Sequence, residues 1–188
     1  MDEIKKHFEK QVSISDRDWQ LFSSKLVRRE FLKKDFIIKA GEKENYLSYI
    51  EKGIVRFSIP TALDELTFGF AFAENFVSAY DFFLTQKPSN YNLQTITDTI
   101  LWSISFEDLQ HIYAETTVGN TIGRLASESL FLKKSKRELS LLTESAGERY
   151  LNLFTEQPHL LKLIPLKYIA SYIGITPQAL SRIRKRIS

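Results

Sequence analysis

The amino-acid sequence predicts an α+β protein: an N-terminal β-barrel or jelly roll, a long helix and a C-terminal helix-turn-helix. Residues 29–105 hold short runs of β-branched and aromatic residues broken by turn residues, which is typical of strands. Residues 118–139 repeat apolar side chains at helical spacing, and two more helical segments meet at a glycine near the C-terminus. We therefore expect three parts, with the limits 1–115, 116–142 and 143–188.

Composition narrows the class of protein. Of the 188 residues, 43% are hydrophobic and 26% are charged, as in ordinary globular domains. No apolar run reaches the roughly 18 residues that span a bilayer, and the first ten residues are rich in charge, unlike a secretory signal. We expect no membrane segment and a cytoplasmic protein.

The chain offers little to metal, redox or nucleophilic chemistry. It has no cysteine, which excludes disulfides and thiolate metal sites. His7, His111 and His159 lie far apart, and residues 29–105 contain no histidine, so a jelly-roll metalloenzyme with clustered His ligands is nearly excluded. We find no Gly-rich phosphate loop and no Ser/His/Asp set. The sequence predicts no cofactor, no metal and no enzyme.

Charge is distributed unevenly along the chain. Residues 157–188 carry six basic residues and no acid, whereas residues 1–156 carry 20 basic and 23 acidic residues. A basic end on a mildly acidic body favours contact with a polyanion. A solvated basic tail would show the same charge pattern, so the residues around these charges must decide.

Two short helices are expected before the strands. Ile4, Phe8 and Val12 recur every four residues, which is the spacing of one helix face. Ser15 is placed to cap a second helix, with acidic residues in its first turn.

The strand-rich region divides into short segments. The expected strands are 36–38, 47–51, 54–59, 66–72, 91–97 and 100–105. The second and third look like a tight hairpin across Lys52-Gly53, with Gly53 supplying a positive φ. The last two look like another pair across Asp98-Thr99. Strands at this density indicate a small β-barrel or jelly roll.

The long helix carries a seam with alternating gaps of four and three residues. The seam residues are Val118, Ile122, Leu125, Ser129, Leu132, Lys136 and Leu139. Such a seam is typical of a helix that pairs with another helix. A helix packed on its own domain would show a similar pattern, and Lys136 departs from an ideal coiled coil. We favour a homodimer, with the first five seam residues at its interface.

The C-terminal segment follows the pattern of a helix-turn-helix. Pro165 suits the start of a helix, Gly174 suits a left-handed turn at its end, and Thr176 is placed to cap a second helix. The residues expected to hold the two helices together are Leu166, Ile169, Ala170, Ile173, Leu180, Ile183 and Ile187.

The opposite face of the second helix carries uncharged polar and basic side chains. Gln and Arg can bond base edges, while Ser, Thr and Lys can bond phosphates. The helix is therefore predicted to bind double-stranded DNA, and its candidate DNA-binding residues are Thr176, Gln178, Ser181, Arg182, Arg184 and Lys185.

Taken together, these features resemble the cyclic-AMP receptor/fumarate-nitrate regulator (Crp/Fnr) superfamily, with a likeness to its shorter members from Bacteroidetes-type bacteria. The specific parts are the Lys39-Ala-Gly-Glu42 turn, the Lys52-Gly-Ile-Val-Arg56 segment and residues 169–185. The resemblance implies a cyclic-nucleotide-binding-like domain, a parallel two-fold dimer and transcription regulation at promoters. It also brings in RNA polymerase and an unknown small-molecule effector as candidate partners.

The sequence departs from that family at the nucleotide site. Members that bind cyclic AMP use a Gly-Glu pair for the ribose and an Arg-Ser or Arg-Thr pair for the phosphate. Here Ser78-Ala79 and Ser89-Asn90 occupy those places, so we do not expect cyclic AMP to bind. The candidate effector pocket, whose residues would otherwise fill the domain's core, comprises Phe70, Phe76, Ser78, Ala79, Tyr80, Ser89 and Asn90.

The reading helix also departs from the family. Pro177-Gln178 replaces the Arg-Glu pair of the familiar cyclic-AMP regulator, whereas Arg182 matches its later arginine. The alternative function is a ligand-sensing or protein-interaction module with a degenerate helix-turn-helix. The effector, the promoters and the sign of regulation stay open at this point.

Overall fold

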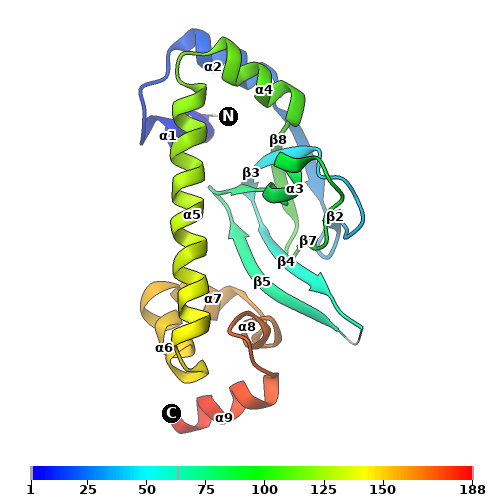
Figure 1. The fold of residues 1–188 in the computed structure, drawn as a ribbon, viewed down its shortest axis with the longest axis vertical. Coiled ribbons are helices and arrows are strands. Elements are labelled where there is room, and N and C mark those ends of the chain that lie inside the picture. Colours follow the sequence, from blue (N-terminus) through cyan, green and yellow to red (C-terminus); the bar gives the residue numbers. More distant parts are fainter. Residues whose placement is uncertain (1, 63, 188) are drawn as a thin grey trace.

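A computed structural model describes residues 2–62 and 64–187 of the chain. Two four-stranded sheets lie beside one long helix, with the C-terminal helices below them (Figure 1). The α+β architecture expected from the sequence is confirmed.

The bounds of the elements are as follows. The helices are α1 (Asp2–Glu9), α2 (Asp16–Ser24), α3 (Tyr80–Thr85), α4 (Phe106–Glu115), α5 (Gly119–Thr143), α6 (Ala146–Glu156), α7 (Pro158–Leu163), α8 (Leu166–Tyr172) and α9 (Pro177–Ile187). The strands are β1 (Val27–Phe31), β2 (Phe36–Ile38), β3 (Tyr46–Lys52), β4 (Ile54–Pro60), β5 (Glu65–Phe72), β6 (Phe76–Val77), β7 (Asn92–Thr95) and β8 (Thr99–Ser105).

The strands form two antiparallel sheets of the jelly-roll kind. The first sheet has the order β1-β8-β3-β6 and the second has the order β2-β7-β4-β5. The sheets do not close into a barrel, so the barrel alternative is corrected to two open sheets. The apolar cluster between them includes Ile50 and Val55 from neighbouring strands of different sheets.

The tight hairpin expected across Lys52-Gly53 and the strand pair expected across Asp98-Thr99 are both wrong. β3 pairs with β8 and β6, while β4 pairs with β5 and β7, so the turn at Gly53 joins two different sheets. The turn between β7 and β8 does the same. Gly53 has the predicted positive φ, 112°, and a Cβ there would lie 2.3 Å from Oγ1 of Thr99. The two corners thus pack on each other, which a local reading of either turn does not reveal.

The strands β1 and β6 were missed by the sequence analysis. β1 is largely charged, with an exposure pattern that alternates weakly, and β6 spans two residues. Such segments carry too little apolar periodicity to predict a strand. The Ser15 cap of α2 is confirmed, because its side chain accepts a hydrogen bond from Asp18 N.

Each sheet is also covered on its outer side. Ile4, Phe8 and Phe22 from α1 and α2 gather with Tyr49 and Ile104 of the first sheet. Residues of α6 to α9 gather with Ile54 and Phe70 of the second sheet. Among the described residues, no helix is long and apolar enough to cross a membrane.

Candidate nucleic-acid interface

The turn between α8 and α9 is tight and is closed by a glycine in the left-handed region, where the sequence predicts it. Gly174 adopts a φ of 79°, Gly174 N donates to Ser171 O at 3.0 Å, and Ile175 N donates to Ala170 O at 3.0 Å. These two bonds are a Schellman end, which satisfies the last carbonyls of a helix through a left-handed glycine. The chain therefore leaves α8 in a fixed direction.

The second helix begins as the sequence predicts. Thr176 Oγ1 accepts a hydrogen bond from Ala179 N at 3.2 Å, and Pro177 is the first helical residue. Such a cap satisfies one of the free N–H groups at a helix start. It fixes the register of α9 and hence the face that α9 presents.

A small apolar core holds α8 against α9. Ile169, Ala170, Ile173 and Leu180 are buried and belong to one cluster, against which Ile183 packs. Two residues expected in this core are not in it. Leu166 is 41% exposed and Ile187 is 45% exposed, because they lie at the outer ends of the two helices.

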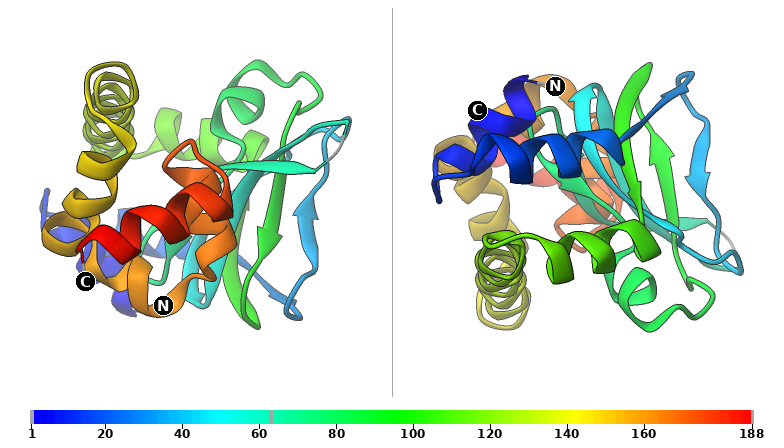
Figure 2. Two further views of the ribbon diagram at one scale, coloured as in Figure 1. Left: turned by 90° about the horizontal axis from the view of Figure 1, so that it is seen from below. Right: turned by 90° about the horizontal axis from the view of Figure 1, so that it is seen from above.

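The outer face of α9 is polar, basic and open. All six candidate DNA-binding residues, Thr176, Gln178, Ser181, Arg182, Arg184 and Lys185, are exposed. Arg182 and Lys185 form no ion pair with any residue in the described ranges. Seen from below, α9 lies in front of the other elements (Figure 2). This arrangement leaves the face accessible to a large partner.

Two arginines tie the end of α8 to the preceding helices. The Arg137 guanidinium of α5 lies 4.1 Å from the Tyr172 ring centroid and donates to Tyr172 O. Arg149 of α6 donates through Nε to Ile173 O at 2.9 Å and through Nη1 to Glu144 O. Carbonyls at a helix end carry partial negative charge, so both contacts are favourable.

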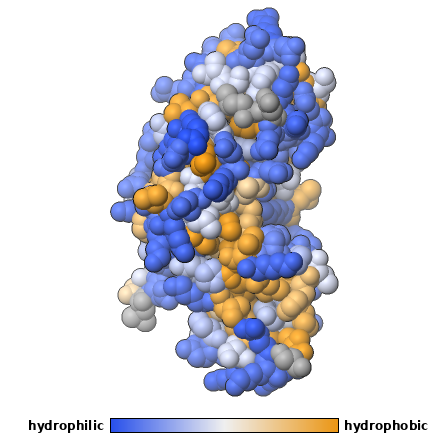
Figure 3. Space-filling view, turned by 180° about the vertical axis from the view of Figure 1, so that it is seen from behind, coloured by the Kyte–Doolittle hydropathy of each residue, from blue (hydrophilic) through white to orange (hydrophobic). Residues whose placement is uncertain are grey.

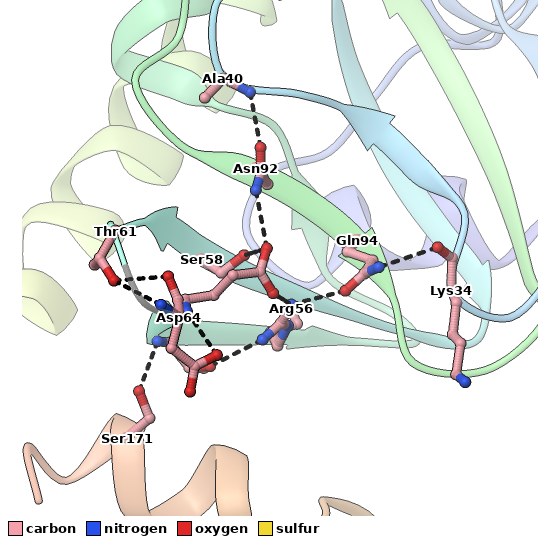
Figure 4. A network of polar contacts seen from close by, with 11 residues as sticks. Lys34, Ala40, Arg56, Ser58, Thr61, Asp64, Asn92, Gln94 and Ser171 are labelled. Atoms are coloured by element: carbon pink, nitrogen blue, oxygen red, sulfur yellow. Dashed lines mark hydrogen bonds and ion pairs between the residues drawn. The ribbon is translucent and has the colours of Figure 1, made fainter.

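The second sheet holds the other side of α8 through a buried arginine. Arg56 of β4 is 1% exposed, and its Nη2 donates to Glu65 and, at 2.7 Å, to Gln94 (Figure 4). Its guanidinium also lies 4.2 Å from the Tyr168 ring centroid.

A neighbouring hydrogen bond continues this contact from sheet to helix. Thr67 N of β5 donates to Oγ of Ser171 at 2.8 Å (Figure 4). Phe70 and Tyr172 add a ring contact with centroids 5.5 Å apart. Helix α8 is thus positioned by the second sheet as well as by α5 and α6.

The long helix α5 exposes much of its apolar surface. Val118, Ile122 and Leu125 of the expected dimer seam are half-buried, whereas Ser129 is exposed and Leu132 is 67% exposed. The sequence analysis missed exposed apolar residues of α5 outside the seam; the most exposed of them are Phe131 (71%) and Leu142 (76%). Apolar side chains gather in the lower half of the rear face (Figure 3). Exposed apolar area of this kind favours a partner surface.

The seven residues of the expected effector pocket are not brought together. Phe70 packs with the C-terminal helices, Phe76 packs beneath α1, and Ala79 packs between the sheets. Of the other four, Ser78 and Ser89 are buried, Tyr80 is half-buried and Asn90 is exposed. These side chains mostly fill cores, which leaves no common pocket for the seven.

A buried carboxylate contacts one of these seven residues, Ala79. Glu44 is 4% exposed and accepts hydrogen bonds from Ala79 N at 3.1 Å and Tyr46 N at 3.0 Å. Burial raises the pKa of the Glu44 carboxyl, and the backbone bond from Ala79 opposes this rise. Burial and the hydrogen bond to Asp81 likewise raise the pKa of Tyr91.

Comparison with known proteins identifies one part of the chain. Residues 28–116 match the cyclic nucleotide-binding domain family. The matched segment runs from Arg28 in β1 to just beyond the end of α4, so it includes both sheets except Val27. No curated protein matches the chain in sequence.

Several solved structures share the fold of most of the chain. CLP of Xanthomonas campestris, described as a c-di-GMP-responsive global regulator, matches with a TM-score of 0.69 and 18% identity over 92% of this chain and 91% of that chain. FixK2 of Bradyrhizobium japonicum matches with a TM-score of 0.73 and 15% identity over 86% and 84%. A Crp/Fnr-family regulator of Eubacterium rectale matches with a TM-score of 0.73 and 16% identity over 93% and 83%.

The chain therefore has the fold of the Crp/Fnr transcription regulators, and its central segment is similar to the cyclic nucleotide-binding domain family. The resemblance drawn from the sequence is confirmed at this level. The likeness to Bacteroidetes-type members stays a prediction, as do the limits of the three parts.

Proposed function

We propose that this protein is a DNA-binding transcription regulator that acts as a homodimer and presents α9 to the major groove. The observation that carries the proposal is the outer face of α9, which is exposed, polar and basic on a rigid helix-turn-helix. The fold shared with Crp/Fnr regulators supports it. Such motifs place a second helix in the major groove, with its first turns nearest the bases.

The exposed residues of α9 divide into two roles. Gln178 lies in the first turn and Arg182 one turn later on the same face, so both reach base edges, as adenine and guanine readers respectively. Thr176, Arg184 and Lys185 hold the phosphate backbone, and Ser181 lies between the two groups. Two copies read an inverted repeat with half-sites about one helical turn apart.

The test is affinity across a randomised operator library at two salt concentrations. Arg182→Ala should cost about 1–3 kcal/mol at the specific site and relax the preference at one base pair per half-site. Lys185→Ala should weaken all sequences alike and lower the salt slope by about one unit per half-site. Lys10→Ala removes an exposed charge directly after α1, which lies at the other end of α5 from α9 (Figure 1); it is the matched control and should change neither.

Two outcomes would count against this assignment. If Arg182→Ala weakened every sequence equally, Arg182 would be a phosphate contact and not a base reader. If the wild-type chain bound no duplex in the library, the alternative of a protein-interaction module with a degenerate helix-turn-helix would replace the proposal.

The dimer is proposed to form along α5. Replacing Ile122 and Leu125 with Glu buries charge in the helix seam, which should yield monomers by light scattering. Lys134→Glu lies on the opposite side of α5 by helical geometry and should leave the dimer intact. A wild-type monomer at concentrations of tens of micromolar would overturn this part of the proposal.

Cyclic AMP is not proposed as the effector. The amide of Ala79, in the place where the family's ribose-binding Glu would stand, is already bonded to Glu44. The place of the phosphate-binding arginine is taken by Ser89, whose Oγ donates to Tyr91 O at 2.8 Å. Calorimetry should show no binding of cyclic AMP tighter than about 10 μM, or about −7 kcal/mol. A tighter constant would refute this.

A further inference from the structure

An arginine lies on the core side of the first sheet without an acceptor. Side chains two residues apart in a strand point to the same face, so Arg29 of β1 faces the same way as Phe31. Phe31 packs against the apolar cluster between the sheets. Arg29 is therefore a cation at the edge of the space that the two sheets enclose.

Two aromatic rings hold this guanidinium in place. Its carbon lies 4.9 Å from the Phe31 ring centroid and 4.7 Å from that of Tyr46. Arg29 is half-buried and forms no hydrogen bond or ion pair with any residue in the described ranges. Arg28, by contrast, is exposed and paired with Glu30. A fixed guanidinium with free donors is prepared to bind an anion.

A cavity of about 420 Å³ opens beside Arg29. Lys43 and Asn45 add further polar groups to its wall, and Ile37, Ile38 and Tyr46 supply an apolar side. This volume lies in the range of sites for small organic molecules, which combine apolar walls with a few placed polar groups.

Two carboxylates also line the cavity, and both are held by backbone N–H groups. Glu42 Oε2 accepts from Lys39 N at 2.8 Å, and Glu44 accepts from Ala79 N and Tyr46 N. Neither carboxylate forms a hydrogen bond or ion pair with Arg29, although the charge of Arg29 helps to lower the pKa of the Glu44 carboxyl, and the two carboxylates balance the charges of Arg29 and Lys43. The two carboxylates repel any anion, but they repel a polyphosphate, with several negative charges, more strongly than a single carboxylate, which also matches the planar arginine fork.

We propose that this cavity binds a small organic monocarboxylate, with its carboxylate on Arg29 and its apolar body against Ile37, Ile38 and Tyr46. The proposal concerns binding by the sheet domain alone, and it stands or falls independently of DNA binding by α9.

The test is a site-resolved titration of the full chain, followed by nuclear magnetic resonance of the arginine Nε–H groups and the backbone amides. Site resolution matters because the basic face of α9 also attracts anions. Sodium benzoate should shift Arg29 Nε–H and Tyr46 N–H with saturation. Uncharged benzamide, of the same shape, and sodium chloride at equal ionic strength should not. Inorganic phosphate should shift Arg29 less than benzoate does.

Variants of adjacent residues make the comparison sharp. Arg29→Gln should weaken benzoate binding at least about tenfold, since it removes the charged fork. Arg28→Gln removes the same charge from the exposed face of the same strand and should change binding by less than about twofold, because exposed charge is screened. If Arg29→Gln does not fold, as judged by circular dichroism, Lys43→Gln takes its place with a smaller weakening in the same direction.

Two results would overturn the proposal. One is that neither benzoate nor hexanoate shifts the Arg29 Nε–H resonance in a saturable way. The other is an equal loss of affinity in Arg28→Gln and in the cavity variant, which would reduce the effect to surface charge.

Discussion

The two sheets of this protein are both covered on their outer sides, but by covers of different chemistry. The cover of the first sheet is apolar and rich in aromatic rings, with Phe8 and Phe22 packed 5.1 Å apart by their centroids. The cover of the second sheet is formed by α6 to α9. It is also apolar around Ile54 and Phe70, but it adds polar contacts, namely the Arg56 guanidinium against Tyr168 and the Ser171 hydroxyl on Thr67 N.

This difference bears on how easily each cover separates from its sheet. Apolar surface gains nothing from water, so an apolar cover opens only as the domain unfolds. A polar contact exchanges its hydrogen bonds for bonds to water at a small net cost. We therefore expect local opening to begin at the polar contacts between α8 and the second sheet, at a lower free energy than separation of the N-terminal helices from the first sheet.

The largest effect is expected from the apolar cover. Phe22 is 6% exposed, and Phe22→Ala should lower the free energy of unfolding by about 3–5 kcal/mol. Urea denaturation measures this loss, with Leu32→Ala, at a position 71% exposed, as the control. Amide exchange in α8 relative to the rest of the chain should not change. A selective rise there would mean that the two covers are coupled.

A smaller effect is expected from Arg56. Arg56→Ala leaves Glu65, Gln94 and Thr67 without the guanidinium and should cost about 1–3 kcal/mol. Hydrogen exchange should rise in α8 more than in β1 and β8, because the contact to the helix weakens first. Arg56→Met keeps the packing of the side-chain stem and should restore part of the loss. A uniform rise in hydrogen exchange across the chain would mean that Arg56 stabilises the sheet but does not hold α8 to it.

The smallest effect is expected from Ser171. Ser171→Ala removes the acceptor of Thr67 N and should cost about 1 kcal/mol. As in Arg56→Ala, hydrogen exchange should rise in α8 more than in β1 and β8, but by a smaller amount. The control is Ser127→Ala on α5, away from this contact. If both changes have the same effect, the hydrogen bond from Thr67 to Ser171 does not hold α8 to the sheet.

Local chemistry explains what the sequence could predict. The positive φ of Gly174, the Thr176 cap and the exposed face of α9 follow from residues within a few positions of one another, and each is found in the structure. The long helix and the position of most strands followed from spacing in the same way. These features depend on backbone preference and periodicity, which a single sequence carries.

Strand pairing and pocket membership could not be read in this way. A hairpin at Gly53 fits the local pattern, but Thr99, 46 positions later in the sequence, packs against that turn and the chain passes to the other sheet. Phe70 and Phe76 looked like members of one pocket because both lie near the nucleotide motif. They face different covers, since the sheets that carry them are buried on both sides.

The contact between Gly53 and Thr99 has a consequence for how the domain folds. β3 pairs with β8 in the first sheet and β4 pairs with β7 in the second, so the same two stretches of chain, before and after these corners, build both sheets. Neither sheet can assemble before the distant stretches meet. Pairing across so long a loop is slow to begin. Once it has begun, both sheets form together. The domain should consequently fold late in synthesis, after residue 105 is available, and unfold in a single step.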